Sequence, residues 1–514
     1  MATDQMTVIE PIDLATLTPD SFQDQPVAVL GLARSGICLV RYLTDRGARV
    51  TVYDGRSASE LADAIAALGG RDVRLALGPD IEPGQVLQGQ AFVATSPSIS
   101  SHFPTTEPRL RAALAALEAA GRVPVVSEVD LFLRLCPAVT IGVTGTKGKT
   151  TTSSLIAAVL AQGSEPVVLG GNIGSPLVER LPELTPRHRV VVELSELQLP
   201  TLSRGTDVSV YTHVTSDHLD RHGNVESYRE VKRRLARLTP STGVLVLNDE
   251  DPVIRDWDAD SPARVVRYRR GAPAEGGVGV EDGWVVARHV VPFLEAAAAA
   301  VGSRASGSGT DGPIVPLGEL RLPGWHSVSN VAAAVAVGAI FGLSAAAIRA
   351  GVAGFGGVEH RLEPVATAAG VRFVNDSQGT QPDAVIAAVR SFARPLVLIC
   401  GGRAKGVAMD ALAAAVAERV TAAVLIGESG PELGAVFRAA GLTHTEQAGS
   451  MEEAVVIADR IARAARPSPS VDVATVLLSP AAASFDMYID YAARGRAFKD
   501  AVAELIRARE GSAA

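Results

Sequence analysis

Short apolar runs alternate with longer Ala-rich or amphipathic stretches along most of this chain. The short runs predict buried strands, and the stretches between them predict crossover helices. This alternation is typical of α/β proteins whose sheets are mainly parallel. We expect three domains of this kind, at residues 1–136, 137–356 and 357–514.

The first block opens with an apolar strand at residues 27–30 and a turn from Gly31 to Gly36. A helix follows, and a strand at residues 49–53 ends at Asp54. This order resembles the opening of a dinucleotide-binding unit, but Ala33 stands where that fingerprint has its middle glycine. The motif alone fits a nucleotide site and a tight turn without a ligand equally well.

The other two blocks repeat the pattern of strands and helices. The second has apolar strands at residues 190–194, 208–214 and 244–248, an Ala/Gly/Ser-rich surface loop within 296–312, and a closing helix after Asn330. The third starts near Gly356 and has strands at 371–375, 395–400, 423–426 and 475–478. These four strands predict a further doubly wound sheet.

Composition supports this outline and excludes several classes of protein. The 514 residues, 47% hydrophobic and 4% aromatic, suit an Ala/Val/Leu-rich protein of about three or four domains. A net charge of −8 argues against binding to nucleic acid. The apolar stretch 331–343 is too short to span a membrane and predicts a buried helix. With no secretory signal and three scattered cysteines (Cys38, Cys136, Cys400) that we expect as free buried thiols, we predict a cytoplasmic protein.

Residues 142–152 form the most informative motif, a glycine-rich turn between a strand at 138–143 and a helix at 153–161. Backbone N–H groups of such a turn bind phosphate at the start of a helix. Lys149 can reach the β- and γ-phosphates of a nucleoside triphosphate, and the Thr150 hydroxyl can hold Mg²⁺. Because only Thr146 and Lys147 separate Gly145 from Gly148, the loop is shorter than the common phosphate-binding pattern.

Polar residues also follow several of the predicted strands. Glu193 ends one strand, and residues 215–221, which include His218, follow another. Residues 375–377 and Ser479 follow two more. Each cluster alone is better explained by capping or solvation, but beside a phosphate loop they predict a site at the carboxyl ends of strands. Glu193 and Thr150 carry the oxygen ligands that suit Mg²⁺, and His218 can add a nitrogen ligand or a hydrogen bond.

In order and spacing, these motifs resemble the Mur ligase family over nearly the whole chain. The matching segments are residues 144–150, 171–174, 193–195, 217–221, 228–232, 322–326, 359–361, 375–377 and 478–481. The resemblance implies a Rossmann-like UDP-binding domain, a central P-loop ATPase domain and a C-terminal Rossmann-like domain. It also implies an ATP- and Mg²⁺-dependent amide ligase that adds D-glutamate to UDP-N-acetylmuramoyl-L-alanine through an acyl phosphate, in peptidoglycan precursor synthesis. We expect a monomer with no membrane span and no nucleic-acid partner.

Site residues follow from the resemblance by matched position. The implied catalytic residues are Lys149, His218 and Lys232, and the implied Mg²⁺ ligands are Thr150, Glu193, His218 and a carbamylated Lys232. The implied ATP contacts are Gly145, Thr146, Lys147, Gly148, Lys149, Thr150, Thr151, Asn330, Arg361 and Asp376. The implied contacts to the UDP-sugar are Ser35, Arg56 and Asn172, and those to glutamate are Thr380, Lys405, Ser484, Phe485 and Tyr491.

Lys232 has two interpretations. The residues alone favour an ordinary exposed lysine on the basic helix face at 229–237. The resemblance favours a lysine that carries a CO₂-derived carbamate, which helps to position Mg²⁺ and the phosphoryl group.

The chain departs from the family pattern in four places. Gln378 replaces a lysine near the active site, residues 195–198 read Ser-Glu-Leu-Gln, Ser327 replaces an asparagine, and Ser98 replaces a glycine. An L-glutamate ligase or another amino-acid-adding member would share every motif named above.

Three further functions compete with this one. An NAD(P)-dependent oxidoreductase would explain the turn at 31–36 but not the phosphate loop. A nucleotide-gated binding protein without ligase activity would not need Glu193, His218 and Lys232. A folylpolyglutamate synthase-like ligase would share the phosphate loop, but it is disfavoured by the first block and by residues 478–486.

Overall fold

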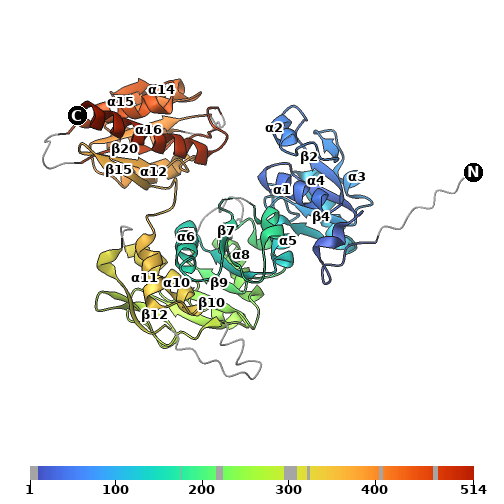
Figure 1. Ribbon diagram of the computed structural model, residues 1–514. Coiled ribbons are helices and arrows are strands. Elements are labelled where there is room, and N and C mark those ends of the chain that lie inside the picture. Colours follow the sequence, from blue (N-terminus) through green and yellow to red (C-terminus); the bar gives the residue numbers. More distant parts are fainter. Residues whose placement is uncertain are drawn as a thin grey trace, which may run out of the picture. The chain divides into compact units, whose positions relative to one another are not determined.

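The computed structural model describes residues 10–174, 176–215, 224–293, 310–320, 325–403, 409–466, 473–484 and 486–513. The chain forms two compact units, Met1–Phe355 and Gly356–Ala514. Three sheets, of five, nine and six strands, account for the strands of Figure 1. Each expected block contains one sheet, which confirms the predicted α/β fold class.

The first sheet is entirely parallel, in the order β3-β2-β1-β4-β5. Because β1 lies between β2 and β4, the strand order reverses beside β1, which is where open α/β sheets bind ligands. Apolar residues of α1 and α5 cover one face, and those of α3 and α4 cover the other. The elements are β1 Pro26–Leu30, α1 Arg34–Asp45, β2 Arg49–Asp54, α2 Ala62–Ala66, β3 Arg74–Leu77, α3 Pro83–Leu87, β4 Phe92–Thr95, α4 Pro108–Ala120, β5 Val125–Ser127 and α5 Glu128–Leu135.

The second sheet has the order β14-β13-β12-β11-β10-β9-β6-β8-β7. Strands from β7 through β12 pair in parallel, and the hairpin strands β13 and β14 add an antiparallel edge that the sequence did not predict. Its strands are β6 Val139–Thr144, β7 Val167–Gly171, β8 Arg189–Glu193, β9 Val208–Tyr211, β10 Val244–Asn248, β11 Arg264–Tyr268, β12 Val278–Glu281, β13 Trp284–Ala287 and β14 Gly312–Pro316. Its helices are α6 Lys149–Leu160, η2 Leu177–Glu183, α8 Val225–Leu238, α10 Trp325–Ile340 and α11 Ala345–Gly354.

Close helix packing explains the small residues in this part of the chain. α10 and α11 pack against α6, and a Cβ on Gly351 would lie 2.6 Å from the Val159 Cα. Buried residues run from Val331 to Ile340 in α10, so the predicted buried helix is confirmed. No helix among the described residues is long and apolar enough to cross a membrane. Cys38 and Cys400 are buried, whereas Cys136 is only partly buried.

The third sheet has the order β15-β16-β20-β17-β18-β19 and is parallel except for β15. Helices α15 and α16 cover one face, and α12, α13 and α14 cover the other. The elements are β15 Glu363–Ala368, β16 Val371–Asn375, α12 Pro382–Arg390, β17 Leu396–Gly401, α13 Asp410–Arg419, β18 Ala422–Ile426, α14 Gly430–Ala439, β19 Thr445–Gln447, α15 Met451–Ala464, β20 Ala474–Leu478 and α16 Tyr491–Ala513. The four predicted strands are present, and the sequence missed the two edge strands.

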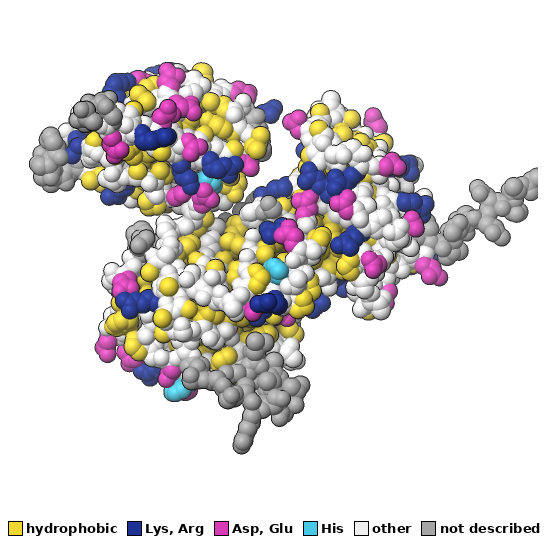
Figure 2. Space-filling model, in the orientation of Figure 1, with side chains coloured by type: hydrophobic (Ala, Val, Ile, Leu, Met, Phe, Trp, Pro, Cys, Tyr) yellow, Lys and Arg dark blue, Asp and Glu magenta, His cyan; other side chains and the backbone are white. Residues whose placement is uncertain are grey.

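Figure 2 shows basic and acidic side chains interspersed over the visible surface of both units. This distribution agrees with the modest net charge of −8.

Helix α5 links the first sheet to the second, and a buried carboxylate at its start joins it to η2. Glu128 is 3% exposed, and its Oε1 accepts a hydrogen bond of 3.2 Å from the backbone N–H of Val178. Burial raises the pKa of Glu128 to about 7, although this hydrogen bond and the positive charge of Arg34 act in the opposite direction.

This pKa predicts how stability depends on pH. Between pH 4.5 and about 7 the folded protein holds a proton on Glu128 that the unfolded chain has lost, so stability falls as pH rises. Glu128→Gln removes this ionisation and should flatten the pH dependence of the thermal midpoint across that window, where wild type loses on the order of 3 kcal/mol of unfolding free energy. Glu226→Gln, at a side chain 82% exposed, is the matched control. Parallel pH curves for Glu128→Gln and wild type would contradict the prediction.

Candidate active site

The phosphate loop lies between β6 and α6, as predicted, and is docked on the end of β9. Thr146 donates its backbone N–H to the His213 carbonyl (2.6 Å), and Thr212 donates its hydroxyl to the Lys147 carbonyl (2.7 Å). Gly145 and Gly148 have φ of 149° and 86°, and a Cβ on Gly145 would lie 2.0 Å from the Thr212 Oγ1. Gly145 therefore has to be glycine, because its φ and its distance to Thr212 leave no room for a side chain.

Helix α6 begins at Lys149, four residues earlier than the sequence predicted. Gly148 is its N-cap residue and provides no side-chain cap, so the first N–H groups of the helix remain available to a phosphate. Lys149 donates its ammonium to the carbonyls of Gly145 (3.1 Å) and Thr146 (3.0 Å). These contacts hold the cation at the loop where the β- and γ-phosphates are expected.

Glu193 ends β8, directly beside the phosphate loop. Parallel pairing places Glu193 opposite Val143, the residue before the turn. The carboxylate is 1% exposed, and its Oε1 accepts a 2.7 Å hydrogen bond from the Asn172 Nδ2. Oε2 is buried without a hydrogen-bond partner in the described part of the chain. A buried carboxylate oxygen with free acceptor capacity fits a hard cation such as Mg²⁺.

Few other side chains that could bind a metal lie close together in the described residues. Across the described ranges, no group of three His, Cys, Asp or Glu side chains lies close enough to hold a metal. Mg²⁺ is commonly held by one or two protein oxygens together with substrate phosphates and water, and Glu193 and the Thr150 hydroxyl at the start of α6 are the residue types that could supply them. His218 lies outside the described residues.

Lys232 is buried, so its interpretation as an ordinary exposed lysine is wrong. The side chain is 0% exposed on α8, and its Nζ lies 3.4 Å from the Thr144 Oγ1 at the end of β6. It also lies 5.6 Å from the centre of the Tyr228 ring. Thr144 in turn donates its hydroxyl to the Leu194 carbonyl, so Lys232 belongs to the same polar group as Glu193 and the phosphate loop.

A cavity of about 330 Å³ adjoins the phosphate loop. Its lining residues are Lys147, Gly148, Thr212, His213, Asn248, Glu250, Arg270, Ser329 and Asn330. Asn330 stands at the loop: its Oδ1 accepts from the Thr152 hydroxyl and would lie 2.9 Å from a Cβ on Gly148. Next to the phosphate loop, a pocket of this size suits the nucleoside of ATP. His213 lines this cavity, and its Nδ1 lies 2.7 Å from the Oδ2 of the buried Asp251.

Two of the predicted contacts to the UDP-sugar, Ser35 and Arg56, lie at the first sheet, whereas Asn172 follows β7 of the second sheet and bonds Glu193. Ser35 is in the first turn of α1, whose N-cap residue has no side-chain cap. Arg56 follows β2 and forms two hydrogen bonds to Asp54, of 3.0 and 2.8 Å. Burial would raise the pKa of Asp54, but the bonds from Arg56 and from the Leu32 N–H outweigh it and lower the pKa, so Asp54 is an anion at neutral pH. A cavity of about 350 Å³ opens beside these residues.

The second unit holds Asp376 and Arg361, the predicted ribose and phosphate contacts. Asp376 follows β16, accepts 2.6 Å from the Ser479 hydroxyl and 3.1 Å from the Leu362 N–H. Burial raises the pKa of Asp376 to about 6, and the charge of Arg361 acts in the opposite direction. Gln378, at the position of the family's lysine, donates its N–H to the His360 carbonyl.

The predicted glutamate contacts that the structure describes also lie in this unit. Thr380 follows the segment 375–377, Ser484 is 3% exposed after β20, and Tyr491 begins α16. Ser377 donates its hydroxyl to the Tyr491 carbonyl at 2.7 Å, which brings these segments together. Lys405 and Phe485 lie outside the described residues.

Sequence reasoning missed Arg494, which holds these segments together. Arg494 is 1% exposed on α16, and its guanidinium donates to the Ser377 hydroxyl and carbonyl and to the Ala482 and Ala483 carbonyls. These bonds fix the strand ends that carry Ser377 and Ser484. A single arginine in a helix gives no spacing signal, so only the folded contacts reveal it.

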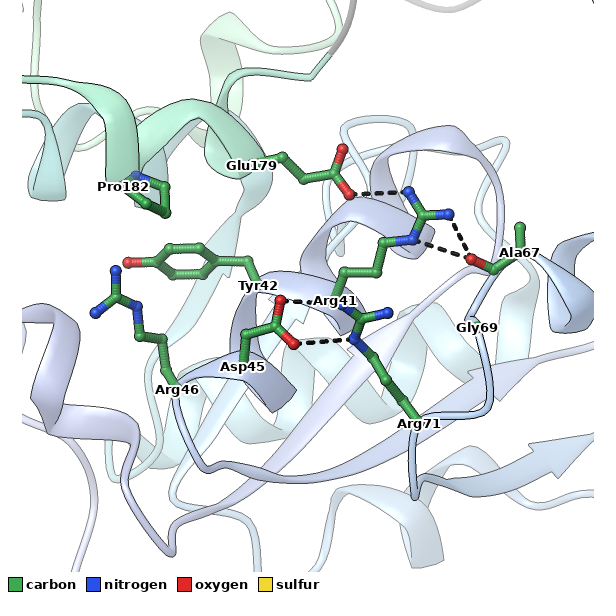
Figure 3. Close-up of a pocket in the computed structure, with 9 residues that line it drawn as sticks. All are labelled: Arg41, Tyr42, Asp45, Arg46, Ala67, Gly69, Arg71, Glu179 and Pro182. Carbon is green, nitrogen blue, oxygen red and sulfur yellow. Dashed lines mark hydrogen bonds and ion pairs between the residues drawn. The ribbon is translucent and has the colours of Figure 1, made fainter.

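A cavity of about 450 Å³ at the C-terminal end of α1 was also not predicted from the sequence (Figure 3). Arg41 bridges the Glu179 carboxylate and the Ala67 carbonyl, and Arg71 pairs with Asp45. Because both guanidinium groups already have partners, this cluster joins α1 to η2 as a structural contact.

Comparisons with known proteins agree with this arrangement. Residues 25–118 match the Mur ligase MurD-like N-terminal domain, residues 143–338 the Mur ligase middle domain, and residues 360–482 the Mur ligase glutamate ligase domain. The UDP-N-acetylmuramoylalanine–D-glutamate ligase of Symbiobacterium thermophilum is 37% identical over 93% of this chain and 98% of its own. The enzyme of the same name from Pelotomaculum thermopropionicum is 35% identical over 94% of this chain and 98% of its own.

Solved structures show the same fold at lower identity. The UDP-N-acetylmuramate-alanine ligase MurC of Thermotoga maritima has a TM-score of 0.51 and 17% identity, over 93% of this chain and 99% of its own. MurF of Acinetobacter baumannii has a TM-score of 0.50 and 14% identity, over 89% of this chain and 91% of its own. Near full-length identity above a third, three matching domains in order and a phosphate loop of the expected form together show that the chain belongs to the Mur ligase family.

Proposed function

We propose that this protein is an ATP-dependent ligase that joins D-glutamate to UDP-N-acetylmuramoyl-L-alanine in peptidoglycan precursor synthesis. One observation carries the proposal: β6, β8 and α8 bring the phosphate loop, a buried carboxylate with a free oxygen, and a buried lysine together. Relatives that match nearly the whole chain are named UDP-N-acetylmuramoylalanine–D-glutamate ligase, which supports the same reaction.

The chemistry explains why these groups belong together. A carboxylate is a poor electrophile until phosphorylation gives it a leaving group. Transfer of the γ-phosphoryl group of ATP to the L-alanyl carboxylate gives an acyl phosphate and ADP. The amine of glutamate then attacks the acyl carbon, forming the amide and releasing phosphate and a proton.

The residues of the first unit would position and neutralise the anions in this reaction. Lys149 and the open N-terminus of α6 would hold the β- and γ-phosphates. Glu193 and Thr150, with His218, would hold Mg²⁺, which would offset the charge of the phosphoryl group when bound. Asn172 orients Glu193 through its Nδ2 and would present its remaining amide oxygen to the muramoyl substrate.

The second unit would bind the incoming glutamate and part of ATP. Asp376 and Arg361 would contact the ribose and phosphates, and Thr380, Lys405, Ser484, Phe485 and Tyr491 would contact glutamate. Lys405 supplies a cation for the two carboxylates of this substrate. Because all of these groups belong to one chain, a monomer would suffice for the reaction. ATP and nucleotide sugars are cytoplasmic substrates, so we propose a cytoplasmic enzyme.

Substrate dependence tests the proposal directly. ADP release should require UDP-N-acetylmuramoyl-L-alanine and glutamate together, and it should be faster with D-glutamate than with L-glutamate. The measurement is a coupled ADP assay run separately with each enantiomer, with either substrate omitted as the control. Full-rate phosphate release with folate substrates, and none with this pair, would refute the assignment; a preference for L-glutamate would redirect it to the L-glutamate-adding alternative.

We also propose that Lys232 carries a carbamate in the active enzyme. Its uncharged amine would attack CO₂, forming an N–C bond and releasing one proton, and the side chain is fully buried. The resulting anion would lie beside Thr144 and could assist Glu193 in positioning Mg²⁺.

Lys232→Ala should therefore lose activity by about 10- to 100-fold, as expected for loss of a group that orients a metal site. Added short carboxylic acids should restore part of the rate, because they replace the missing anion. Mass spectrometry under CO₂ should show the mass of one CO₂ on the wild type only. Arg237→Ala, at a partly exposed arginine of the same helix, is the control; unchanged activity in Lys232→Ala would rule out the carbamate role.

A further inference from the structure

The start of α5 is the point where the chain leaves the first sheet and turns toward the second. Strand β5 ends at Ser127, α5 begins at Glu128, and β6 of the second sheet follows at Val139. The side chains of Ser127 and Glu128 are both buried. Each of these neighbours bonds to a different loop of the second sheet, so the start of α5 connects the first sheet to both loops.

Ser127 holds the loop that follows Glu193. Its hydroxyl caps α5 by accepting from the Asp130 N–H at 3.3 Å, and it lies 2.7 Å from the Thr201 hydroxyl. Thr201 donates to the Gln198 carbonyl at 2.7 Å. The loop between Glu193 and Thr201 is therefore joined to the end of the first sheet by a chain of hydrogen bonds.

Glu128 holds the loop that follows β7. Its Oε1 accepts at 3.2 Å from the N–H of Val178 in η2, the helical turn that comes after Asn172. Asn172 in turn donates its Nδ2 to the Glu193 Oε1 at 2.7 Å. Both loops beside Glu193 are therefore anchored at the same place on the first sheet.

Few charged or titratable groups surround Glu128. Helix α1 contributes Arg34 and Cys38, whose thiol stays neutral because burial raises its pKa, and η2 contributes Glu179, which pairs with Arg41 (Figure 3). Burial raises the pKa of Glu128 to about 7, and Glu179 acts in the same direction, against the backbone hydrogen bonds and the charge of Arg34. A change in the charge near Glu128 therefore changes how much proton it binds at neutral pH.

Arg34 connects this carboxylate to the expected position of the diphosphate. It is exposed, begins α1 and precedes Ser35, the predicted UDP-sugar contact at the uncapped start of that helix. A diphosphate there would bring negative charge next to Arg34 and offset the positive charge that stabilises the Glu128 carboxylate. The protonated carboxyl would then be favoured, and its carbonyl oxygen could still accept from Val178.

Resting on the proposed ligase function, we propose that Glu128 is a positioning residue for the UDP-sugar. It holds η2, and with it the Asn172 loop, at a fixed distance from the diphosphate site, and one of its oxygens takes up a proton from solvent when the diphosphate binds. A substrate that spans both sheets needs this fixed distance, because its carboxylate has to meet the phosphate loop. Linkage then requires the UDP-sugar to bind more tightly as pH falls through neutrality.

Titration calorimetry with UDP-N-acetylmuramoyl-L-alanine on the full-length protein tests the proton uptake, since this ligand has no group that titrates near neutral pH. Runs at pH 7 in buffers of different ionisation enthalpy should show uptake of roughly 0.3 to 0.4 proton by the wild type, whose affinity should fall about two- to fivefold between pH 6 and 8. Glu128→Gln resembles the protonated carboxyl, so it should bind without this uptake and with an affinity that does not change with pH. Glu226→Gln, at an exposed side chain, is the matched control and should behave as the wild type does.

Steady-state kinetics test the positioning role. Glu128→Ala removes the acceptor for Val178, so the KM for the UDP-sugar should rise about tenfold, while the KM for ATP should change by less than about twofold. Glu128→Gln keeps an acceptor for Val178 and should retain a KM close to that of the wild type at low pH.

Equal proton uptake in Glu128→Gln and wild type, or a parallel rise of both KM values in Glu128→Ala, would overturn the proposal. The failure of the proposed function looks different. A wild-type protein that binds no UDP-N-acetylmuramoyl-L-alanine in the calorimeter would refute that function and this inference with it.

Discussion

The contact between the phosphate loop and the end of β9 is the constraint on which the site depends. Two of the loop's glycines adopt positive φ, and its backbone is held by the Thr146 N–H bond to the His213 carbonyl and by the Thr212 hydroxyl bond to the Lys147 carbonyl. A side chain at Gly145 would collide with Thr212. The position of the first turn of α6, and with it of Lys149 and Thr150, therefore follows from the pairing of β6 with β9.

Parallel pairing then determines which groups meet that loop. Strand β8 pairs with β6 on the side opposite β9, and this register places Glu193 next to Val143. Glu193 therefore lies beside the turn. Lys232 reaches the same place from α8, through Thr144 at the end of β6. The result is a site built for positioning and neutralising anions, which is what carboxylate activation by ATP requires. The second unit repeats the principle, since Asp376 follows β16 and Ser479 follows the adjacent β20.

Much of this could be predicted from the sequence, because local patterns carry it. The phosphate loop, the principal parallel strands and Glu193 at a strand end follow from apolar runs bounded by glycine and polar residues. The antiparallel edge strands β13 and β14 were missed because β13 has only four residues and β14 begins at Gly312, at the end of the predicted surface loop, and contains two prolines.

Burial was the property hardest to predict. The helix α8 has four arginines and one buried lysine in a single basic stretch, and only packing against Thr144 and Tyr228 distinguishes Lys232. The same holds for Glu128 and Arg494, whose roles depend on partners far away in the chain.

The central claim is that this site uses ATP to activate a carboxylate, and the path of oxygen tests it most directly. The carboxylate of UDP-N-acetylmuramoyl-L-alanine can be labelled with ¹⁸O and incubated with the protein, ATP, Mg²⁺ and D-glutamate. Transfer through an acyl phosphate predicts that each turnover moves one labelled oxygen into inorganic phosphate and leaves the other in the amide product. Inorganic phosphate that contains no label, released together with the amide product, would contradict the account.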